Sequence, residues 1–138
     1  AQCLVGSEMC IRDRDDTNTF SVEESIRDIF MDQTLPDIII CLNELSTTCV
    51  YQAVVDYNCV GEIAILGYYD TDTILKAIER NVITATISID TEQMGAFCVD
   101  ALQEYYNYGY TSQYFTADVT VIDQSNVEEY LGKQEEAE

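Results

Sequence analysis

The chain has 138 residues, of which 47% are hydrophobic, and this is the size and composition of one ordinary folded domain. Six Lys and Arg residues stand against 26 Asp and Glu residues, so the formal net charge is −20 at pH 7. Such a field repels phosphate backbones, which excludes nucleic acid as an expected partner and makes a neutral or cationic ligand easier to accommodate. The same acidity could serve only to keep a surface hydrated. No stretch approaches the roughly 20 apolar residues of a membrane-spanning segment.

Residue types that carry common chemistries are missing. The sequence has no histidine, which is the commonest general base and metal ligand, and its six cysteines form no C-x-x-C pair. It also has no Gly-rich phosphate loop and no G-x-S-x-G motif. We therefore expect no enzyme, no metal site and no cofactor, and we expect the cysteines to be buried free thiols.

The N-terminal segment stands apart from the rest. Residues 4–14 resemble a translated sequencing-adapter segment of the kind found at the ends of gene predictions. We therefore expect residues 1–18 to be non-native or disordered and the natural beginning of the protein to be missing. The S-x-x-E spacing of Ser21 and Glu24 is typical of a capping box and predicts that the first helix opens there. Pro36 should separate this helix from the first strand.

Three apolar runs, at residues 38–42, 63–67 and 85–89, each end in polar residues and pass into a helix-like segment. Apolar strands that alternate with amphipathic helices predict a parallel sheet covered on both faces. The helices between the runs are expected at residues 46–57 and 72–81. The fold class is therefore α/β, a three-layer α/β/α arrangement around a mostly parallel sheet.

After the third run, Asp90 should cap the longest helix, with Gln93 three residues on, and Gly109 should end it. Its apolar face is expected to be Met94, Phe97, Cys98, Ala101, Leu102, Tyr105 and Tyr106. A half-exposed edge strand at 114–122 and a short helix capped near residues 125–128 follow. Residues 132–138 form an acidic tail.

Ligands of such sheets bind beyond the carboxyl ends of the strands. The candidate binding residues at these ends are Asn43, Glu44, Tyr68, Tyr69, Asp70 and Asp90. Structural roles are open for each of them. Glu44 and Ser46 could cap the second helix, Asp70 could cap the third, and the two tyrosines could be packing residues.

Several strings resemble the C-terminal part of a sugar-type periplasmic binding protein, the type I clamshell family that feeds ABC importers. The resemblance covers residues 19–131, through the strings at 35–39, 65–70, 75–87, 93–96 and 121–127. It implies an incomplete C-terminal lobe of the type I periplasmic binding protein fold, with the helix at 91–107 belonging to the other lobe. About half of a natural protein would then be represented, and the missing strands would leave apolar edges and faces uncovered, a hazard for aggregation or dimerisation.

The resemblance also implies residue roles. Asn43 matches an asparagine that hydrogen-bonds sugar hydroxyls in family members. Tyr69 falls where many members carry an aspartate, so Asp70 would have to replace that carboxylate. Ile89 falls where some members have a glutamine, and Asp90 is next to it, so the solute could differ from the common pentoses and hexoses.

The implied function is the solute-binding component of an ABC importer. It would hold a sugar or similar polar molecule between two lobes, outside the cytoplasm as a periplasmic or cell-surface lipoprotein, and would deliver it to an ABC transporter permease. The alternative is the effector-binding domain of a lactose-repressor-type transcription regulator, which shares the clamshell. The string at 82–87 looks closer to the transport branch.

Overall fold

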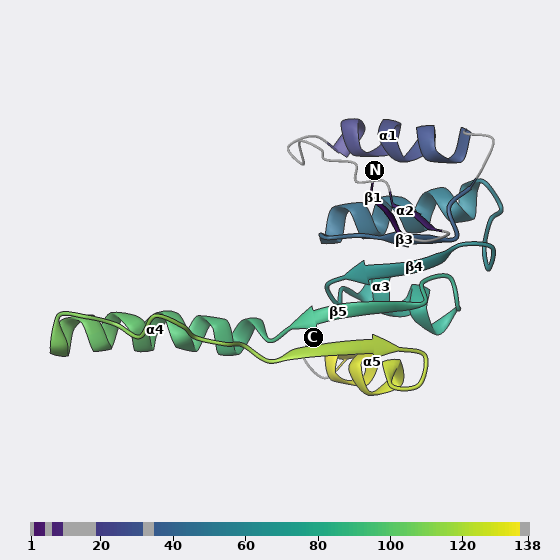
Figure 1. Cartoon of the computed structure of the whole chain (residues 1–138). Helices are drawn as coiled ribbons and strands as arrows, with labels where there is room; N and C mark the ends of the chain where they lie inside the picture. The colour runs from purple at the N-terminus through teal and green to yellow at the C-terminus, as the bar shows by residue number, and fades with distance from the viewer. Residues whose placement is uncertain (1, 5–6, 10–18, 32–34, 136–138) are drawn as a thin grey trace.

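The computed structural model describes residues 2–4, 7–9, 19–31 and 35–135, and Figure 1 shows their arrangement. In chain order the elements are β1 (Gln2–Leu4), β2 (Ser7–Met9), α1 (Thr19–Met31), β3 (Ile38–Ile40), α2 (Glu44–Asp56), β4 (Ala64–Tyr68), α3 (Asp72–Glu79), β5 (Ala85–Ile89), α4 (Thr91–Tyr108), β6 (Val119–Asp123) and α5 (Val127–Glu135). Side chains are described from residue 21 onwards, except at 32–34 and 133–138.

The main sheet has four strands in the order β3-β4-β5-β6. Strands β3, β4 and β5 are parallel, with Ile40 opposite Leu66 and Tyr68 opposite Ile87, and β6 runs antiparallel to β5. The α/β fold and the mostly parallel sheet are therefore confirmed, and β6 is the edge strand that the sequence predicts. The strand is shorter than expected, since residues 114–118 precede it without strand structure.

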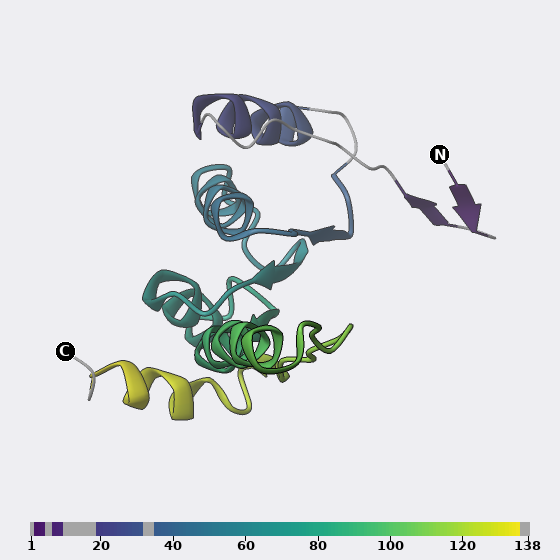
Figure 2. The same cartoon turned by 90° about the vertical axis from the view of Figure 1, so that its left-hand side faces the viewer.

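All of the described helices except α4 lie on one face of this sheet. Figure 2 shows α2, α3 and α5 on the same side of the strands, with α1 lying beyond α2. Helix α2 packs on β4, α1 packs on α2, and α3 packs on α5. Of the three layers expected, the described residues form two, and the opposite face of the sheet has no helical layer among them. Strands β1 and β2 form a separate antiparallel hairpin and do not join the main sheet.

The core lies between the sheet and these helices. Its largest fully buried side chains include Ile65 of β4, Ile74 and Ile78 of α3, and Ile122 of β6. Each such side chain contributes about 1.5–3 kcal/mol on burial. The helical spacing of Val50, Val54 and Tyr57 in the second helix, and of Leu75 and Ile78 in the third, predicts that they face inward, and all of these except Tyr57 are buried. Tyr57 is instead 39% exposed, although its ring stacks on Phe30 with a centroid distance of 5.3 Å.

Two local expectations at the ends of the chain need correction. Helix α1 begins at Thr19, so Ser21 lies inside the helix and is not its cap. The helical spacing of Val22, Ile26, Ile29 and Phe30 predicts one apolar face, and it is present, because Val22, Ile26 and Phe30 are buried and Ile29 is half-buried. Of residues 1–18 the structure describes only β1 and β2, and the expectation for the remainder falls outside the described residues. Residues 132–135 of the expected acidic tail belong to α5.

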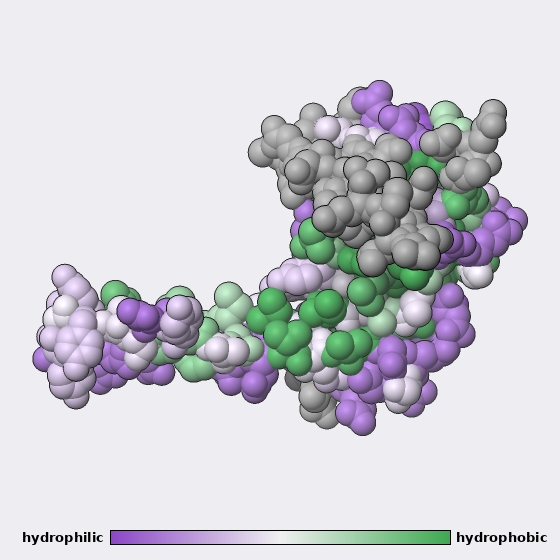
Figure 3. Space-filling view, in the orientation of Figure 1, coloured by the Kyte–Doolittle hydropathy of each residue, from purple (hydrophilic) through white to green (hydrophobic). Residues whose placement is uncertain are grey.

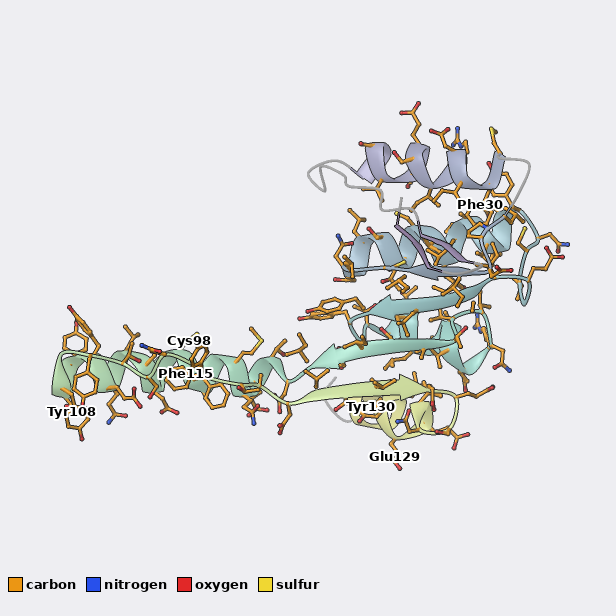
Figure 4. All side chains as sticks on the ribbon, in the orientation of Figure 1. Phe30, Cys98, Tyr108, Phe115, Glu129 and Tyr130 are labelled. Carbon is orange, nitrogen blue, oxygen red and sulfur yellow. The ribbon has the colours of Figure 1, made fainter. Side chains whose placement is uncertain are left out.

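Helix α4 projects away from the sheet, and residues 109–118 return beside it (Figure 1). We call α4 and residues 109–118 the arm. Gly109 ends the helix in the left-handed conformation, at φ 76°, as the sequence predicts. Phe97 and Phe115 hold the two parts together, with ring centroids 5.4 Å apart, and Figure 4 shows Phe115 lying against the helix.

The apolar face predicted for α4 is not buried in this chain. No residue of the helix is buried, and Leu102, Tyr105 and Tyr106 are 61%, 60% and 86% exposed. The physical reason is that the arm extends past the sheet and the covering helices, so among the described residues no helix or strand packs over that face, and only Phe115 of the returning segment lies against its Phe97. Cys98 is exposed for the same reason, whereas Cys41 and Cys59 are buried free thiols as expected.

Candidate functional site

Three parallel strands end at one edge of the sheet. Since β3, β4 and β5 are adjacent and parallel, their carboxyl ends place residues 42–46, 68–72 and 89–93 along the same edge. We call these three segments the rim. All six candidate residues lie on it, and the predicted convergence of the strand ends is confirmed. Whether these residues bind a ligand stays a prediction.

Asn43 begins α2. Its backbone is extended, at φ −151°, and its side-chain Oδ1 accepts a hydrogen bond of 2.7 Å from the backbone N–H of Ser46. Asn43 is therefore the N-cap, a role that the sequence had left to Glu44 or Ser46, and the helix starts at Glu44 instead of near residue 46. The Glu44 side chain is exposed on the first turn.

Thr47 is a rim-supporting residue that the sequence reasoning missed. Its buried hydroxyl donates to the carbonyl of Asn43 at 2.7 Å and accepts from the N–H of Tyr68 at 3.0 Å. Its methyl group fills the space in front of Gly67, where a Cβ would lie 2.6 Å from Thr47 Cγ2. Thr47 thus fixes the end of β3 to the end of β4. The spacing to Asn43 is visible in the sequence, but the contact with Tyr68 spans 21 residues and has no local signal.

Tyr69 adopts a left-handed backbone, at φ 83°, which a non-glycine residue adopts at a cost of order 1–3 kcal/mol. Two bonds to β5 hold it there. The N–H of Tyr69 donates to the carbonyl of Ile87 at 2.8 Å, and the Thr86 hydroxyl donates to the carbonyl of Tyr69 at 2.6 Å. The rings of Tyr68 and Tyr69 are half-exposed and lie 6.1 Å apart. Tyr69 also packs against the hydrophobic core, so the packing role left open for it is present.

Asp70 does not cap α3, which corrects one of its two expected roles. The N-cap is Thr71, and it makes no side-chain capping bond. The half-buried carboxylate of Asp70 instead accepts a hydrogen bond of 2.8 Å from the hydroxyl of Ser88, a β5 residue that the sequence reasoning had not singled out. This bond places a carboxylate between the ends of β4 and β5.

Asp90 caps α4, as predicted, by accepting from the N–H of Gln93 at 2.9 Å. Its own N–H donates to the carbonyl of Asp118 at 3.0 Å, and the N–H of Asp118 donates to Gln93 Oε1 at 2.7 Å. These bonds join the two chain segments that leave the sheet for the arm. Asp90 therefore lies where the sheet and the arm meet.

The charge at the rim is negative. Glu44, Asp70 and Asp90 contribute carboxylates, and Lys76, on the next turn of α3, forms an ion pair with Asp72 at 2.7 Å. Among the described residues no cluster of side chains is suited to hold a metal ion. A hollow of about 430 Å³ lies on the arm and not at the rim; it is lined by exposed or half-exposed residues such as Asp100, Glu104 and Tyr108, so we do not treat it as a site.

The comparisons with known proteins concern the fold. No family model matches the chain, and no curated protein matches its sequence. Solved structures do match. A solute-binding protein of an ABC transporter from Agrobacterium vitis, bound with α-D-tagatopyranose, has a TM-score of 0.76 at 13% identity over 86% of this chain and 40% of its own.

Two further structures agree. A solute-binding protein of an ABC transporter from Bacillus halodurans, with bound myo-inositol, has a TM-score of 0.71 at 18% identity, over 84% of this chain and 40% of its own. A structure described as the XylFII-LytSN complex has a TM-score of 0.68 at 24% identity, over 80% of this chain and 38% of its own. The chain thus has the fold of part of a sugar-type solute-binding protein and spans about two fifths of the length of these structures.

Proposed function

We propose that this chain is part of the solute-binding component of an ABC importer and contributes half of a site for a sugar or similar small polar molecule. The observation that carries the proposal is the rim, where polar and aromatic side chains follow three adjacent parallel strands. Similarity of fold to proteins with tagatopyranose or myo-inositol bound supports the same class of ligand.

Each rim residue has a role in this proposal. The Asp70 carboxylate accepts hydrogen bonds from sugar hydroxyls, and its bond to Ser88 fixes its orientation. Asn43 contacts a sugar hydroxyl through its amide, a group that both donates and accepts hydrogen bonds, in addition to its role as the N-cap of α2. Tyr68 and Tyr69 stack on the ring of the solute, and Glu44 and Asp90 accept from hydroxyls at the two ends of the rim.

A second lobe completes the site. Micromolar binding corresponds to about −8 kcal/mol and needs contacts on both sides of a small solute together with exclusion of water. The rim supplies one side, and α4 leads away from it toward the lobe that it would join. In the full protein this lobe pair would work outside the cytoplasm and present the solute to an ABC permease. No helix of the described residues is long and apolar enough to cross a bilayer.

The test is a titration of the ¹⁵N-labelled chain with D-tagatose, D-allose and myo-inositol, followed by amide chemical shifts. We expect shifts at residues 43–46, 68–71 and 89–93, with a Kd of about 1 mM or weaker, because only half of the site is present. Micromolar affinity of the chain alone would contradict the two-lobe part of the proposal.

Two matched variants test whether the chemical shift changes arise from ligand bound at the rim. Asp70→Asn removes the rim carboxylate charge with little change of shape and is expected to abolish the shifts. Asp100→Asn makes the same change on the exposed surface of α4 and is expected to preserve them. Shifts that are absent from the rim for all three solutes, or that Asp70→Asn leaves unchanged, would contradict the assignment of the site.

A further inference from the structure

Two hydroxyl side chains of β5 are buried next to the rim. Thr86 is 0% exposed and Ser88 is 8% exposed, and they lie on the same side of the strand because alternate residues of a strand share a face. Thr86 is opposite Gly67 of β4 and the fully buried Ile122 of β6. Figure 3 shows hydrophobic side chains gathered on the other side of the sheet. A polar side chain at these two positions therefore needs a local explanation.

The hydrogen bonds of these hydroxyls supply the explanation. A buried hydroxyl is unfavourable unless it is hydrogen-bonded, and valine fits the space of a threonine without that cost. Thr86 donates to the backbone carbonyl of Tyr69 at 2.6 Å, and Ser88 donates to the carboxylate of Asp70 at 2.8 Å. Both bonds therefore end on the two residues that follow β4. We call Tyr69 and Asp70 the corner.

The backbone of Tyr69 is bonded to β5 through both of its polar groups. Its N–H donates to the carbonyl of Ile87 at 2.8 Å, and its carbonyl accepts from the Thr86 hydroxyl. Its φ is 83°, a left-handed conformation that is strained for a residue with a side chain. If the Thr86 hydroxyl were removed, one of these two bonds would remain to oppose the strain.

We propose that Thr86 is a positioning residue of the solute site, an inference that rests on the proposed function. Its hydroxyl holds Tyr69 in the left-handed conformation and thereby places the Asp70 carboxylate beside Ser88. Thr86 is fully buried and contacts no solute, so it acts through the corner. A return of Tyr69 to the right-handed region would rotate its φ by about 120° or more and move Asp70 away from Ser88. Binding would then have to reorder the corner, which lowers affinity.

A purely structural role for Thr86 predicts the opposite ranking of two substitutions. If only its packing matters, Thr86→Val is the milder change because it keeps the shape of the side chain, and Thr86→Ser is the worse one because it leaves a cavity in place of a methyl group. If the hydroxyl positions the corner, Thr86→Ser is the milder change because it keeps the hydrogen bond to Tyr69.

The first measurement is made without solute. The amide and α protons of one residue lie closer together at positive φ than elsewhere, so their intraresidue NOE is strong there. We expect a strong Tyr69 NOE in the unsubstituted chain and in Thr86→Ser, and a weak one in Thr86→Val. Thr84→Val is the matched control, because the Thr84 hydroxyl accepts from the N–H of Ile65 at 3.2 Å, near the other end of β4. This variant should keep the strong Tyr69 NOE.

The second measurement repeats the amide-shift titration with D-tagatose, D-allose and myo-inositol. Thr86→Val should weaken binding about 10-fold or more, whereas Thr86→Ser and Thr84→Val should stay within about threefold of the unsubstituted chain. A Thr86→Val chain that binds as tightly as the unsubstituted chain would overturn the role of Thr86. So would a Thr86→Ser chain that binds as weakly as Thr86→Val.

The two measurements separate this inference from the proposed function. If none of the three solutes shifts the rim amides of the unsubstituted chain, the proposed function is contradicted, and the NOE comparison still decides whether Thr86 sets the corner. A weak Tyr69 NOE in the unsubstituted chain or in Thr86→Ser, or a strong one in Thr86→Val, would overturn that role. Should Thr86→Val fail to fold, the other two chains decide it: both must show the strong NOE and matching affinity.

Discussion

The sheet body and the arm are built from similar apolar patterns with different outcomes. In the body, which consists of β3–β6 with α2, α3 and α5, helix residues at i, i+3 and i+4 spacing become the core, as Leu75 and Ile78 do. In the arm, the apolar residues of α4 follow the same spacing, but none of the 18 residues of this helix is buried. The pattern therefore specifies which face of a helix is apolar, but burial requires a surface to pack against.

The body and the arm are also stabilised by different kinds of interaction. The body is held by apolar burial and by buried hydroxyls such as those of Thr47 and Thr86. The arm is held by exposed contacts, among them the Phe97–Phe115 ring pair and the bonds of Glu104 to residues 111–112. We expect local opening of the arm to require much less free energy than global unfolding of the body.

The largest expected difference between the two regions is in thiol reactivity. Burial raises the pKa of the Cys41 thiol to about 11, so roughly one molecule in a thousand carries the thiolate at pH 8. The buried sulfur must also be exposed before it can react. Cys98 is exposed on α4 and should be alkylated several hundred-fold faster or more. Peptide mass spectrometry of a timed iodoacetamide reaction measures both rates; equal rates would mean that β3 and α2 open as readily as the arm.

Truncation of one large side chain in each region should give the next largest effect. Ile65→Ala removes a fully buried side chain of β4 and should lower the free energy of unfolding by about 2–5 kcal/mol. Leu102→Ala, at a position 61% exposed on α4, should change it by less than about 0.5 kcal/mol. Urea denaturation followed by circular dichroism measures both. A comparable loss for Leu102→Ala would show that the arm is packed against something in solution.

Glycine substitutions should reveal a smaller difference in stability between the body and the arm. A Cβ at Gly67 would lie 2.6 Å from Thr47 Cγ2 and 3.2 Å from Thr86 Oγ1, so Gly67→Ala should destabilise the chain by about 1–3 kcal/mol. A Cβ at Gly95 meets nothing within 4 Å, and Gly95→Ala should stabilise α4 by about 0.4–1 kcal/mol. The effect of Gly67→Ala is measured as a change in the urea midpoint of unfolding. The effect of Gly95→Ala is measured as a change in the helical circular dichroism signal at low denaturant. A neutral Gly67→Ala would mean that α2 can move away from β4.

Gly67 and Thr47 also show why the sequence predicts which residues lie at the rim better than it predicts their hydrogen-bond partners. The three strand-end positions are local features, since each apolar run ends at a definite residue, and parallel pairing brings those ends together. The partner of each rim side chain is not local. Asp70 bonds to Ser88 and Thr47 to Tyr68, and these pairs lie 18 and 21 residues apart. Local sequence offered helix capping as one of two roles for Asp70, and that role proved wrong.

The arm and the side of the main sheet that faces away from α2, α3 and α5 were harder to predict for a different reason. The apolar residues of α4, and those of β3 and β6, have the periodicity of packed elements, and periodicity alone cannot reveal that a covering layer is missing. The resemblance to longer clamshell proteins did predict uncovered apolar faces. That expectation agrees with the finding that the chain spans about two fifths of the length of the matched solved structures.

The smallest expected effect is a local acid transition within the arm. The N–H and hydroxyl of Ser112 donate to the Glu104 carboxylate, the N–H at 2.7 Å, and these bonds lower the pKa of Glu104 from 4.5. Because the pKa is lowered, the bonds stabilise the arm fully at pH values above 4.5 and are lost as the pH falls through the lowered pKa. We expect the Ser112 amide resonance to shift and its hydrogen exchange to accelerate there, while the amide of Ile65 in β4 is unchanged.

Two substitutions on α4 separate this transition from a general acid effect. Glu104→Gln cannot ionise, so its Ser112 amide should show no such transition, with exchange already faster at pH 7. Asp100→Asn, one turn earlier, leaves Glu104 in place and should retain the transition. If Ile65 and Ser112 instead lost protection together at the same pH, the arm and the body would unfold as one unit, and the contrast between an independently opening arm and a packed sheet body would be wrong.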